Sequence, residues 1–336
     1  MTNDPFLFCV YHQDAYPEGN QLLGPKTSLT GREIGQDFSG KEGWNMYHGE
    51  VVPGFPQHPH RGFETVTIVR SGLIDHSDSL GATARFGTGD SQWLTAGNGI
   101  VHSEMFPLVN QQSNNPLELF QIWLNLPKRN KRVPPYFSML WQEKTPVVSE
   151  TDALGRQTFI QLIAGDLRAV QAPPPPPDSW AALPESDLAI WAVRLEPDAL
   201  WTMPAARIGT GRQLFYFKGS QLQLAGSPLP SSTSVHLRPE VEVTLQNGKV
   251  DSELLLLQGK PIGEPVVQHG PFVMNTREEI VEAIDDYRRT TFGGWPWKSD
   301  GPVHPREDVR FARYPDGRYE AAPLAESGGM AKRIGR

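Results

Sequence analysis

Short strand-like segments recur along this chain, and turn-forming residues separate them. Phe63–Val69 is rich in β-branched residues, and Gln92–Thr95 is another short strand-like run. In Leu117–Leu126, alternate residues would face opposite sides of a strand. Gly87–Asp90 and Gly97–Gly99 carry tight-turn residues between these runs. Strands that follow one another every ~8–12 residues without helices between them indicate an antiparallel sandwich or barrel.

The length of the chain predicts more than one such unit. With 336 residues it is about twice the size of a typical domain of roughly 150 residues. The strand pattern stops near residues 127–150, where basic residues and prolines gather. We therefore expect a first domain over residues 1–135, a second over residues 136–320 and a disordered tail over residues 321–336.

The second half repeats the strand pattern and ends in one predicted helix. Ala189–Leu195 is among its clearest strand-like segments. The five prolines Pro173–Pro177 suit either a stiff linker or an insertion loop inside the second domain, because a strand-like stretch precedes them. Thr276 and Glu279 form a capping-box pattern that predicts a short helix over about Arg277–Arg288.

Charge and apolar patterning exclude several classes of protein. The net charge of -7 argues against direct nucleic-acid binding, which needs clustered basic residues. A single cysteine, Cys9, excludes an internal disulfide framework, and its apolar neighbours favour a core position. No secretory signal and no apolar run of ~18–20 residues is visible. We expect a cytoplasmic protein that does not associate with a membrane, and we expect it to be a monomer.

Two pairs of metal-ligand residues stand in the segment with the strongest strand signals. His58 and His60 form one pair, and His102 and Glu104 form the other, each with one residue between its members. Alternate side chains of a strand share a face, so each pair points two donor groups the same way. Three imidazoles and one carboxylate suit Fe, Mn, Ni, Cu or Zn better than Mg or Ca. The pattern predicts one transition-metal site.

The identity of the fourth ligand stays open at this point. Glu64 has the same parity as His58 and His60, so an uninterrupted strand would turn it inward as well. Alternation alone cannot choose between Glu64 and Glu104.

Other polar residues of the first half have two interpretations. His76 and Asp78 either stabilise a turn through local hydrogen bonds or support the ligands near the mouth of the site. Arg61 and Gln92 could orient ligands or substrate. The second half holds widely spaced histidines without a paired pattern, so we expect no second metal there; these are His236, His269 and His304.

Four longer stretches of the chain resemble the signature motifs of the pirin family. Two lie in the first half and two in the second, so the similarity covers both predicted domains. The stretches are Gly54–Thr67, Gly87–Met105, Leu256–Thr276 and Phe292–Trp297.

The resemblance implies an all-β fold of two antiparallel, jelly-roll-like cupin barrels with one metal in the N-terminal barrel. It implies that the ligands are His58, His60, His102 and Glu104, with iron as the expected metal, and it leaves Glu64 a supporting role. It also implies quercetin 2,3-dioxygenase activity on a flavonol with O2 as the second substrate. In that reaction we expect Glu104 to serve both as ligand and as the base that takes the flavonol hydroxyl proton.

A second function class competes with the enzyme. The resemblance to eukaryotic pirins, which act as metal-dependent regulators, implies this alternative. The chain would then be a non-catalytic, iron-dependent redox sensor that acts through a protein partner. A structural bicupin with zinc is a third alternative, although nothing in the ligand set requires it.

Overall fold

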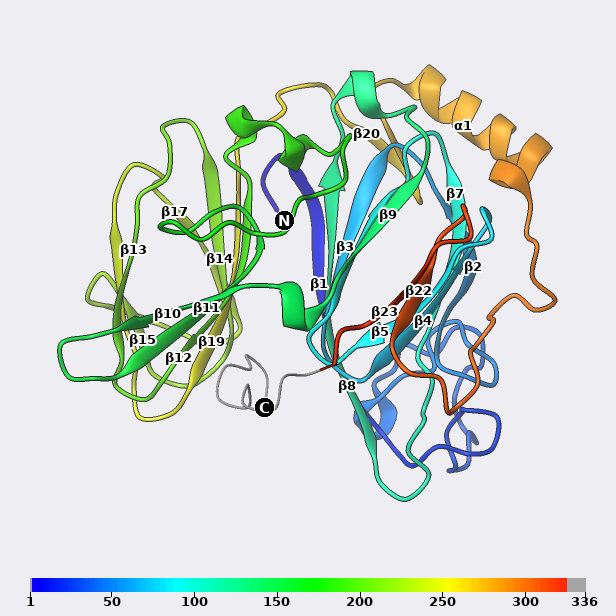
Figure 1. The fold of residues 1–336 in the computed structure, drawn as a ribbon, viewed down its shortest axis with the longest axis horizontal. Coiled ribbons are helices and arrows are strands. Elements are labelled where there is room, and N and C mark those ends of the chain that lie inside the picture. The colour runs from blue at the N-terminus through cyan, green and yellow to red at the C-terminus, as the bar shows by residue number, and fades with distance from the viewer. Residues whose placement is uncertain (1, 325–336) are drawn as a thin grey trace. The chain divides into compact units, whose positions relative to one another are not determined.

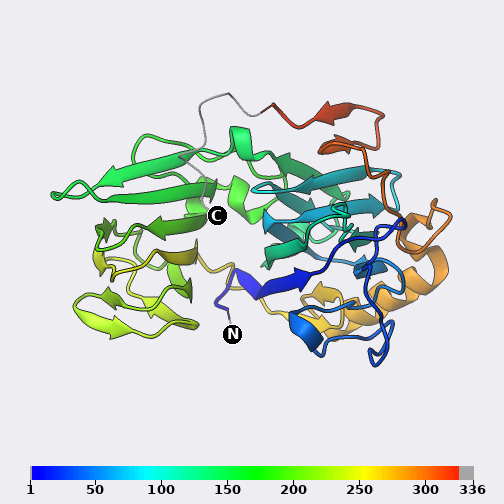
Figure 2. The same cartoon turned by 90° about the horizontal axis from the view of Figure 1, so that it is seen from below.

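The computed structural model of the chain describes residues 2–324. These residues form two compact units, each built almost entirely of antiparallel strands (Figures 1 and 2). The larger unit contains residues 9–142 together with residues 264–324, and the smaller unit contains residues 2–8 and 143–263. The chain thus returns to its first unit after residue 263, whereas we expected a second domain that is continuous over 136–320.

The larger unit consists of two main sheets and a small hairpin. One sheet has the order β1-β8-β3-β6-β9, the other has the order β2-β7-β4-β5-β22-β23, and β20 pairs with β21. Their bounds are β1 Phe6–Tyr16, β2 Gly54–His60, β3 Phe63–Ser71, β4 Leu73–Asp78, β5 Thr83–Gly87, β6 Ser91–Thr95, β7 Ile100–Met105, β8 Asn115–Asn125, β9 Tyr136–Leu140, β20 Val267–His269, β21 Phe272–Met274, β22 Phe311–Arg313 and β23 Tyr319–Ala321.

The core of the larger unit lies between its two main sheets. Apolar side chains from both sheets pack into one cluster. From the first sheet come Tyr16, Val69, Leu94, Leu119 and Phe137, and from the second come Ile74, Phe86, Ile100 and Ala312.

The smaller unit repeats this plan with a six-stranded and a four-stranded sheet. Their orders are β10-β11-β12-β19-β14-β17 and β13-β18-β15-β16. The bounds are β10 Val147–Thr151, β11 Gln157–Ala164, β12 Ala189–Leu195, β13 Leu200–Met203, β14 Gly211–Lys218, β15 Leu222–Leu224, β16 Ser227–Leu229, β17 Thr233–Leu237, β18 Val243–Gln246 and β19 Ser252–Gly259. A shared apolar core that includes Trp191, Trp201, Leu214, Leu245 and Leu256 holds the sheets together.

The expected fold class is confirmed: the chain is a mostly β, two-domain cupin protein with one C-terminal helix. In each unit the two sheets remain separate and are not joined into one closed barrel. Pro173–Pro177 lies between β11 and β12, which are neighbours in one sheet of the smaller unit. The proline run is therefore an insertion loop and not a linker between the units.

The helix α1, Arg277–Thr290, begins at the predicted capping box. Thr276 Oγ1 accepts from the Glu279 backbone N–H, and the Glu279 carboxylate accepts in return from the Thr276 N–H. Its buried residues Ile280 and Ala283 pack with β21. The helix belongs to the larger unit, although it follows the smaller unit in sequence.

No helix within residues 2–324 is long and apolar enough to cross a membrane. Of the tail expected over residues 321–336, Ala321 ends β23, and residues 325–336 lie outside the described part of the chain.

Candidate metal centre

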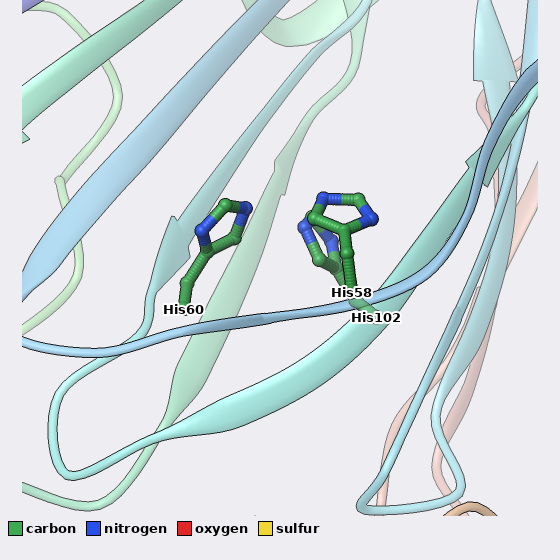
Figure 3. A group of neighbouring side chains, drawn as sticks. All are labelled: His58, His60 and His102. Carbon is green, nitrogen blue, oxygen red and sulfur yellow. The ribbon is translucent and has the colours of Figure 1, made fainter. Parts of the chain in front are cut away.

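Three histidines converge between the sheets of the larger unit (Figure 3). His58 and His60 project from β2, and His102 projects from the adjacent antiparallel β7, where it is the cross-strand partner of His58. One ring nitrogen from each lies within 4.8 Å of the others. The expectation that alternate residues place these donors on one face is thus met by the geometry.

The surroundings of the three rings keep them neutral. Burial lowers the pKa of His58 to about 4, and burial together with the neighbouring imidazoles lowers the pKa of His60 and His102 well below the usual value. His58 Nδ1 lies 2.8 Å from the Pro56 carbonyl oxygen. Because a carbonyl can only accept, Nδ1 carries the proton and Nε2 keeps a free lone pair.

The polar atoms of His102 fit a bound metal ion. Both of its ring nitrogens are buried, and neither has a hydrogen-bond partner among residues 2–324. Leaving a buried polar atom unpaired costs free energy, so such atoms are usually satisfied by a partner. Neutral imidazoles whose lone pairs are not used in hydrogen bonds are the form that binds transition metals. The donor set therefore fits a metal at this point.

Glu104 reaches the same place from β7. Its Oε2 lies 4.0 Å from His102 Nε2 and accepts a hydrogen bond from Gln121 Nε2 at 2.8 Å. Thr67 Oγ1 donates to Oε1 at 3.3 Å. Burial raises the pKa of Glu104, while His76, Gln121 and Thr67 act in the opposite direction. The structure thus brings the three predicted histidine ligands together and places Glu104 beside His102, and the assignment of Glu104 as a ligand stays a prediction.

Glu64 lies on the opposite face of its strand. Thr67 on β3 faces Glu104, so the even-numbered Glu64 on that strand faces away, where Thr95 Oγ1 donates to its Oε1 at 2.7 Å. The chain between His60 and β3 is interrupted at Gly62, which has φ +85. A side chain there would meet the Val273 carbonyl oxygen. Because the strand is interrupted here, Glu64 does not share a face with His58 and His60, although its parity is the same.

His76 and Asp78 form the local turn that was one of the two interpretations, and their support of the ligands stays a prediction. The Asp78 carboxylate accepts from the backbone N–H groups of Leu80 and Ala82, which stabilises the turn after β4. Its other oxygen lies 3.2 Å from His76 Nε2, and the His76 ring centroid lies 5.5 Å from that of His102. The pair therefore forms a turn and also borders the histidine cluster.

The two other suggested supporting residues differ in position. Arg61 donates to Asp286 of α1 at 2.8 Å and to Asn98 at 2.6 Å, so it anchors the helix to the β2–β3 turn. Gln92 is buried as the cross-strand partner of Thr67, and its Nε2 has no hydrogen-bond partner in the described chain. Gln92 thus remains a candidate for orienting substrate.

Sequence reasoning missed the groups that surround the four donors. Gln121 and Thr67 contact Glu104, and both positions follow from strand parity once the two sheets are known to face each other. Two aromatic rings also flank the histidines: Trp123 has its ring centroid 5.5 Å from His60, and Phe55 has its centroid 6.3 Å from His58. Both aromatic side chains are partly exposed.

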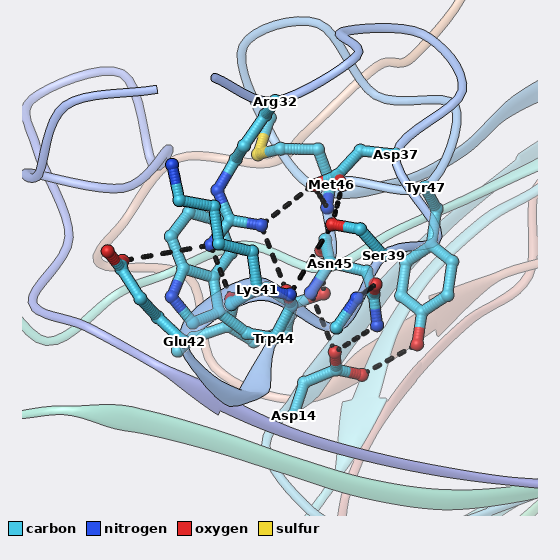
Figure 4. Close-up of polar contacts among 12 residues, drawn as sticks. Asp14, Arg32, Asp37, Ser39, Lys41, Glu42, Trp44, Asn45, Met46 and Tyr47 are labelled. Atoms are coloured by element: carbon cyan, nitrogen blue, oxygen red, sulfur yellow. Dashed lines mark hydrogen bonds and ion pairs between the residues drawn. The ribbon is translucent and has the colours of Figure 1, made fainter. Parts of the chain in front are cut away.

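A polar network fixes the loop between β1 and β2, whose residue Tyr47 packs against Phe55 (Figure 4). Arg32 and Asp37 form a buried ion pair at 2.8 Å, and the Arg32 guanidinium lies 3.3 Å above the ring of Trp44. Tyr47, at the end of the loop, donates its hydroxyl proton to Asp14 at 2.7 Å. Its ring centroid lies 5.0 Å from that of Phe55. The network therefore positions one wall of the site.

The remaining histidines of the second half are dispersed. His236 is on β17 of the smaller unit and hydrogen bonds with Asn3, while His269 and His304 belong to the larger unit. No second cluster of three metal-ligand side chains occurs within residues 2–324.

Comparison with known proteins agrees with this architecture. The family model Pirin matches residues 29–124, and the Pirin C-terminal cupin domain matches residues 190–293. A Pseudomonas aeruginosa protein provisionally named a quercetin 2,3-dioxygenase is 37% identical over 243 residues, which cover 71% of this chain and 79% of that protein. Human Pirin is 34% identical over 269 residues, covering 76% and 84%.

A solved structure extends the likeness to three dimensions. The crystal structure of quercetin 2,3-dioxygenase from Acinetobacter baumannii superposes with a TM-score of 0.68 at 28% identity and covers 87% of each chain. Two strand-built units with a histidine triad between the sheets of one of them define a two-domain cupin protein. The chain belongs to the pirin family.

Proposed function

We propose that this pirin is a metal-dependent dioxygenase that acts on flavonol-type aromatic substrates. One metal ion, iron by preference, would be held by His58, His60, His102 and Glu104. The observation that carries the proposal is the triad of neutral imidazoles beside a buried carboxylate. Three histidines and one carboxylate leave about two positions of an octahedral ion free for substrate and O2.

The walls of the site support a flat aromatic substrate. Phe55 and Trp123 flank the triad, and both are partly exposed, as is His58 itself. Aromatic side chains favour planar ligands through stacked or edge-to-face contacts. The Acinetobacter baumannii protein is named a quercetin 2,3-dioxygenase and the Pseudomonas aeruginosa relative provisionally so, which supports the same substrate class.

Glu104 would receive the proton of the flavonol hydroxyl. Burial raises the pKa of its carboxyl, which makes the carboxylate a stronger base than an exposed one. Gln121 and Thr67 hold its two oxygens and would keep it oriented as it changes between proton acceptor and ligand. When bound, the metal would supply Lewis acidity and a redox centre for the reaction with O2.

Metal analysis and oxygen uptake together test the proposal. The protein would be purified without oxygen, its metal content measured, and O2 consumption followed after addition of quercetin. We expect about one iron per chain and quercetin-dependent uptake. Bound iron without uptake would instead favour the redox-sensing regulator that acts through a protein partner. Protein that binds no transition metal would refute both functions.

The variant Glu104→Gln separates the two roles of this residue. The amide preserves the shape of the side chain and one oxygen ligand, but it is no longer a base. We expect turnover to be lost while part of the metal remains bound. Unchanged turnover would exclude Glu104 as the base.

A further inference from the structure

A second pocket with buried polar groups lies in the smaller unit, which has no histidine cluster among its described residues. Its volume is about 450 Å³, within the range of small-molecule sites. Side chains from the ends of β12, β14 and β19 line it. Its lining includes Arg212, Trp191, Gln258, Asp187 and Arg207.

Arg212 is a buried cation with an open hydrogen-bonding edge. The residue is only 2% exposed, and its Nη1 donates to the Pro204 carbonyl oxygen at 2.9 Å. Its Nε has no hydrogen-bond partner among the described residues. The Nε–Nη2 edge is the planar fork that binds a carboxylate through two parallel hydrogen bonds. The Nε of this edge therefore lacks the partner that a buried donor usually has.

Within the described chain, Arg212 forms no ion pair with a side chain of the pocket. Asp187 acts on it electrostatically, but its carboxylate accepts from Thr210 Oγ1 at 2.8 Å and lies 3.8 Å from Arg207 Nε. Burial lowers the pKa of Arg212, which reflects the cost of holding this charge away from water. An anionic ligand would offset that cost.

Two neighbours of Arg212 also carry unpaired buried atoms. Gln258 is its cross-strand partner, and Gln258 Oε1 has no hydrogen-bond partner in the described structure. The same holds for Trp191 Nε1, on the adjacent strand β12. Within residues 2–324, three residues on three neighbouring strands thus line one pocket and each carries an unpaired buried polar atom, whereas buried polar atoms are usually paired.

We propose that this pocket binds a small organic carboxylate, with the carboxylate on the Nε–Nη2 edge of Arg212 and a planar apolar body against Trp191. Three arginines line the pocket. Arg168 pairs with Glu150 at 3.0 Å and Arg207 lies 3.8 Å from Asp187, whereas Arg212 has no ion-pair partner among the described residues, which favours an anion at Arg212. This site is independent of the proposed dioxygenase function.

Benzoate and its uncharged analogue benzamide test the proposal on the intact protein. Binding would be measured by isothermal titration calorimetry and by the indole N–H signals in nitrogen–proton NMR spectra, with Trp191→Phe used to assign the Trp191 signal. We expect benzoate to shift that signal and to bind about tenfold or more tightly than benzamide, because a charge-assisted bidentate contact is lost with the amide.

The variant Arg212→Gln should weaken benzoate binding by about tenfold or more. Arg194→Gln is the matched control: Arg194 is on the same strand as Trp191, but it pairs with Asp251 at 3.0 Å and does not line the pocket. We expect this control to bind benzoate as the wild type does. The far-ultraviolet circular dichroism of both variants would verify their folding.

Equal affinity for benzoate and benzamide, or no saturable binding of benzoate at millimolar concentration, would overturn the proposal. So would a folded Arg212→Gln variant that binds benzoate normally. If Arg212→Gln does not fold, the comparison of benzoate with benzamide and the response of the Trp191 signal still test the proposal. Both measurements are made on protein that retains Arg212.

Discussion

His58 and His102 are cross-strand partners on β2 and β7, and their ring centroids lie 4.5 Å apart. Two neutral imidazoles at this separation gain little from each other and would gain much from a shared ion. The register of two adjacent strands therefore sets the geometry of the candidate metal centre.

The variant His102→Ala should lose most of its metal. It removes one of three converging nitrogens, and metal affinity depends on the complete set of ligands. Metal content per chain would be measured after purification and dialysis. His269→Ala is the control, because His269 is exposed on β20 and outside the triad. Metal content that stays equal in both variants would contradict the site.

The two carboxylates of the first half should differ in their effect on metal binding. We expect Glu104→Ala to lose metal and Glu64→Ala to keep it, because Glu64 faces away from the triad and bonds with Thr95. The change at Glu64 should instead lower the free energy of unfolding by about 1–2 kcal/mol, since it leaves Thr95 unpaired in the interior. The reverse pattern of metal loss would show that Glu64 is the ligand.

Acid should destabilise the protein in part through His12. Burial lowers the pKa of His12 to about 4 from its usual value of 6.5. Between these pH values the unfolded chain binds a proton that the folded chain does not, so stability is lost as the pH falls from 6.5 to 4. The contribution of His12 should amount to about 2–3 kcal/mol.

The variant His12→Gln would isolate this contribution. His12 Nδ1 lies 2.8 Å from the Tyr47 hydroxyl, whose single proton goes to Asp14. Glutamine can donate to that hydroxyl as histidine does, but it does not titrate. Urea unfolding at about pH 7 and about pH 4 should therefore show a smaller loss for the variant. An identical loss in both proteins would exclude His12 as the cause.

Lys131 should be important for the stability of the larger unit. Its buried ammonium donates to the Gly62 carbonyl oxygen at 2.7 Å, to Asn125 Oδ1 at 2.6 Å and to the Val273 carbonyl oxygen at 3.1 Å. Lys131→Met would leave these acceptors without their donor, at a cost of about 2–4 kcal/mol. Urea unfolding would measure it, with the exposed Lys128→Met as a control that should change little.

Many local features of this chain could be predicted from its sequence. β12 has the bounds expected for Ala189–Leu195, and β6 includes the expected Gln92–Thr95. The capping box at Thr276 begins a helix as expected. His58 and His60 share a face, as their spacing indicated. Such features depend on alternation and on hydrogen bonds between residues close in sequence, so the local pattern is sufficient.

Other features depend on contacts between distant parts of the chain. Glu64 faces away from the triad because the turn at Gly62 approaches the Val273 carbonyl and interrupts the strand. Helix α1 belongs to the larger unit, where Asp286 pairs with Arg61. Neither contact can be predicted from the local sequence pattern.

The sequence alone therefore determined the strands, the helix and the two pairs of potential ligands, since each is encoded over a few neighbouring residues. The tertiary structure decided which carboxylate lies beside the histidines, where α1 packs, and which polar groups meet in the pocket around Arg212. These outcomes require sheets and segments far apart in the chain to pack together, and packing selects contacts that local patterns do not specify.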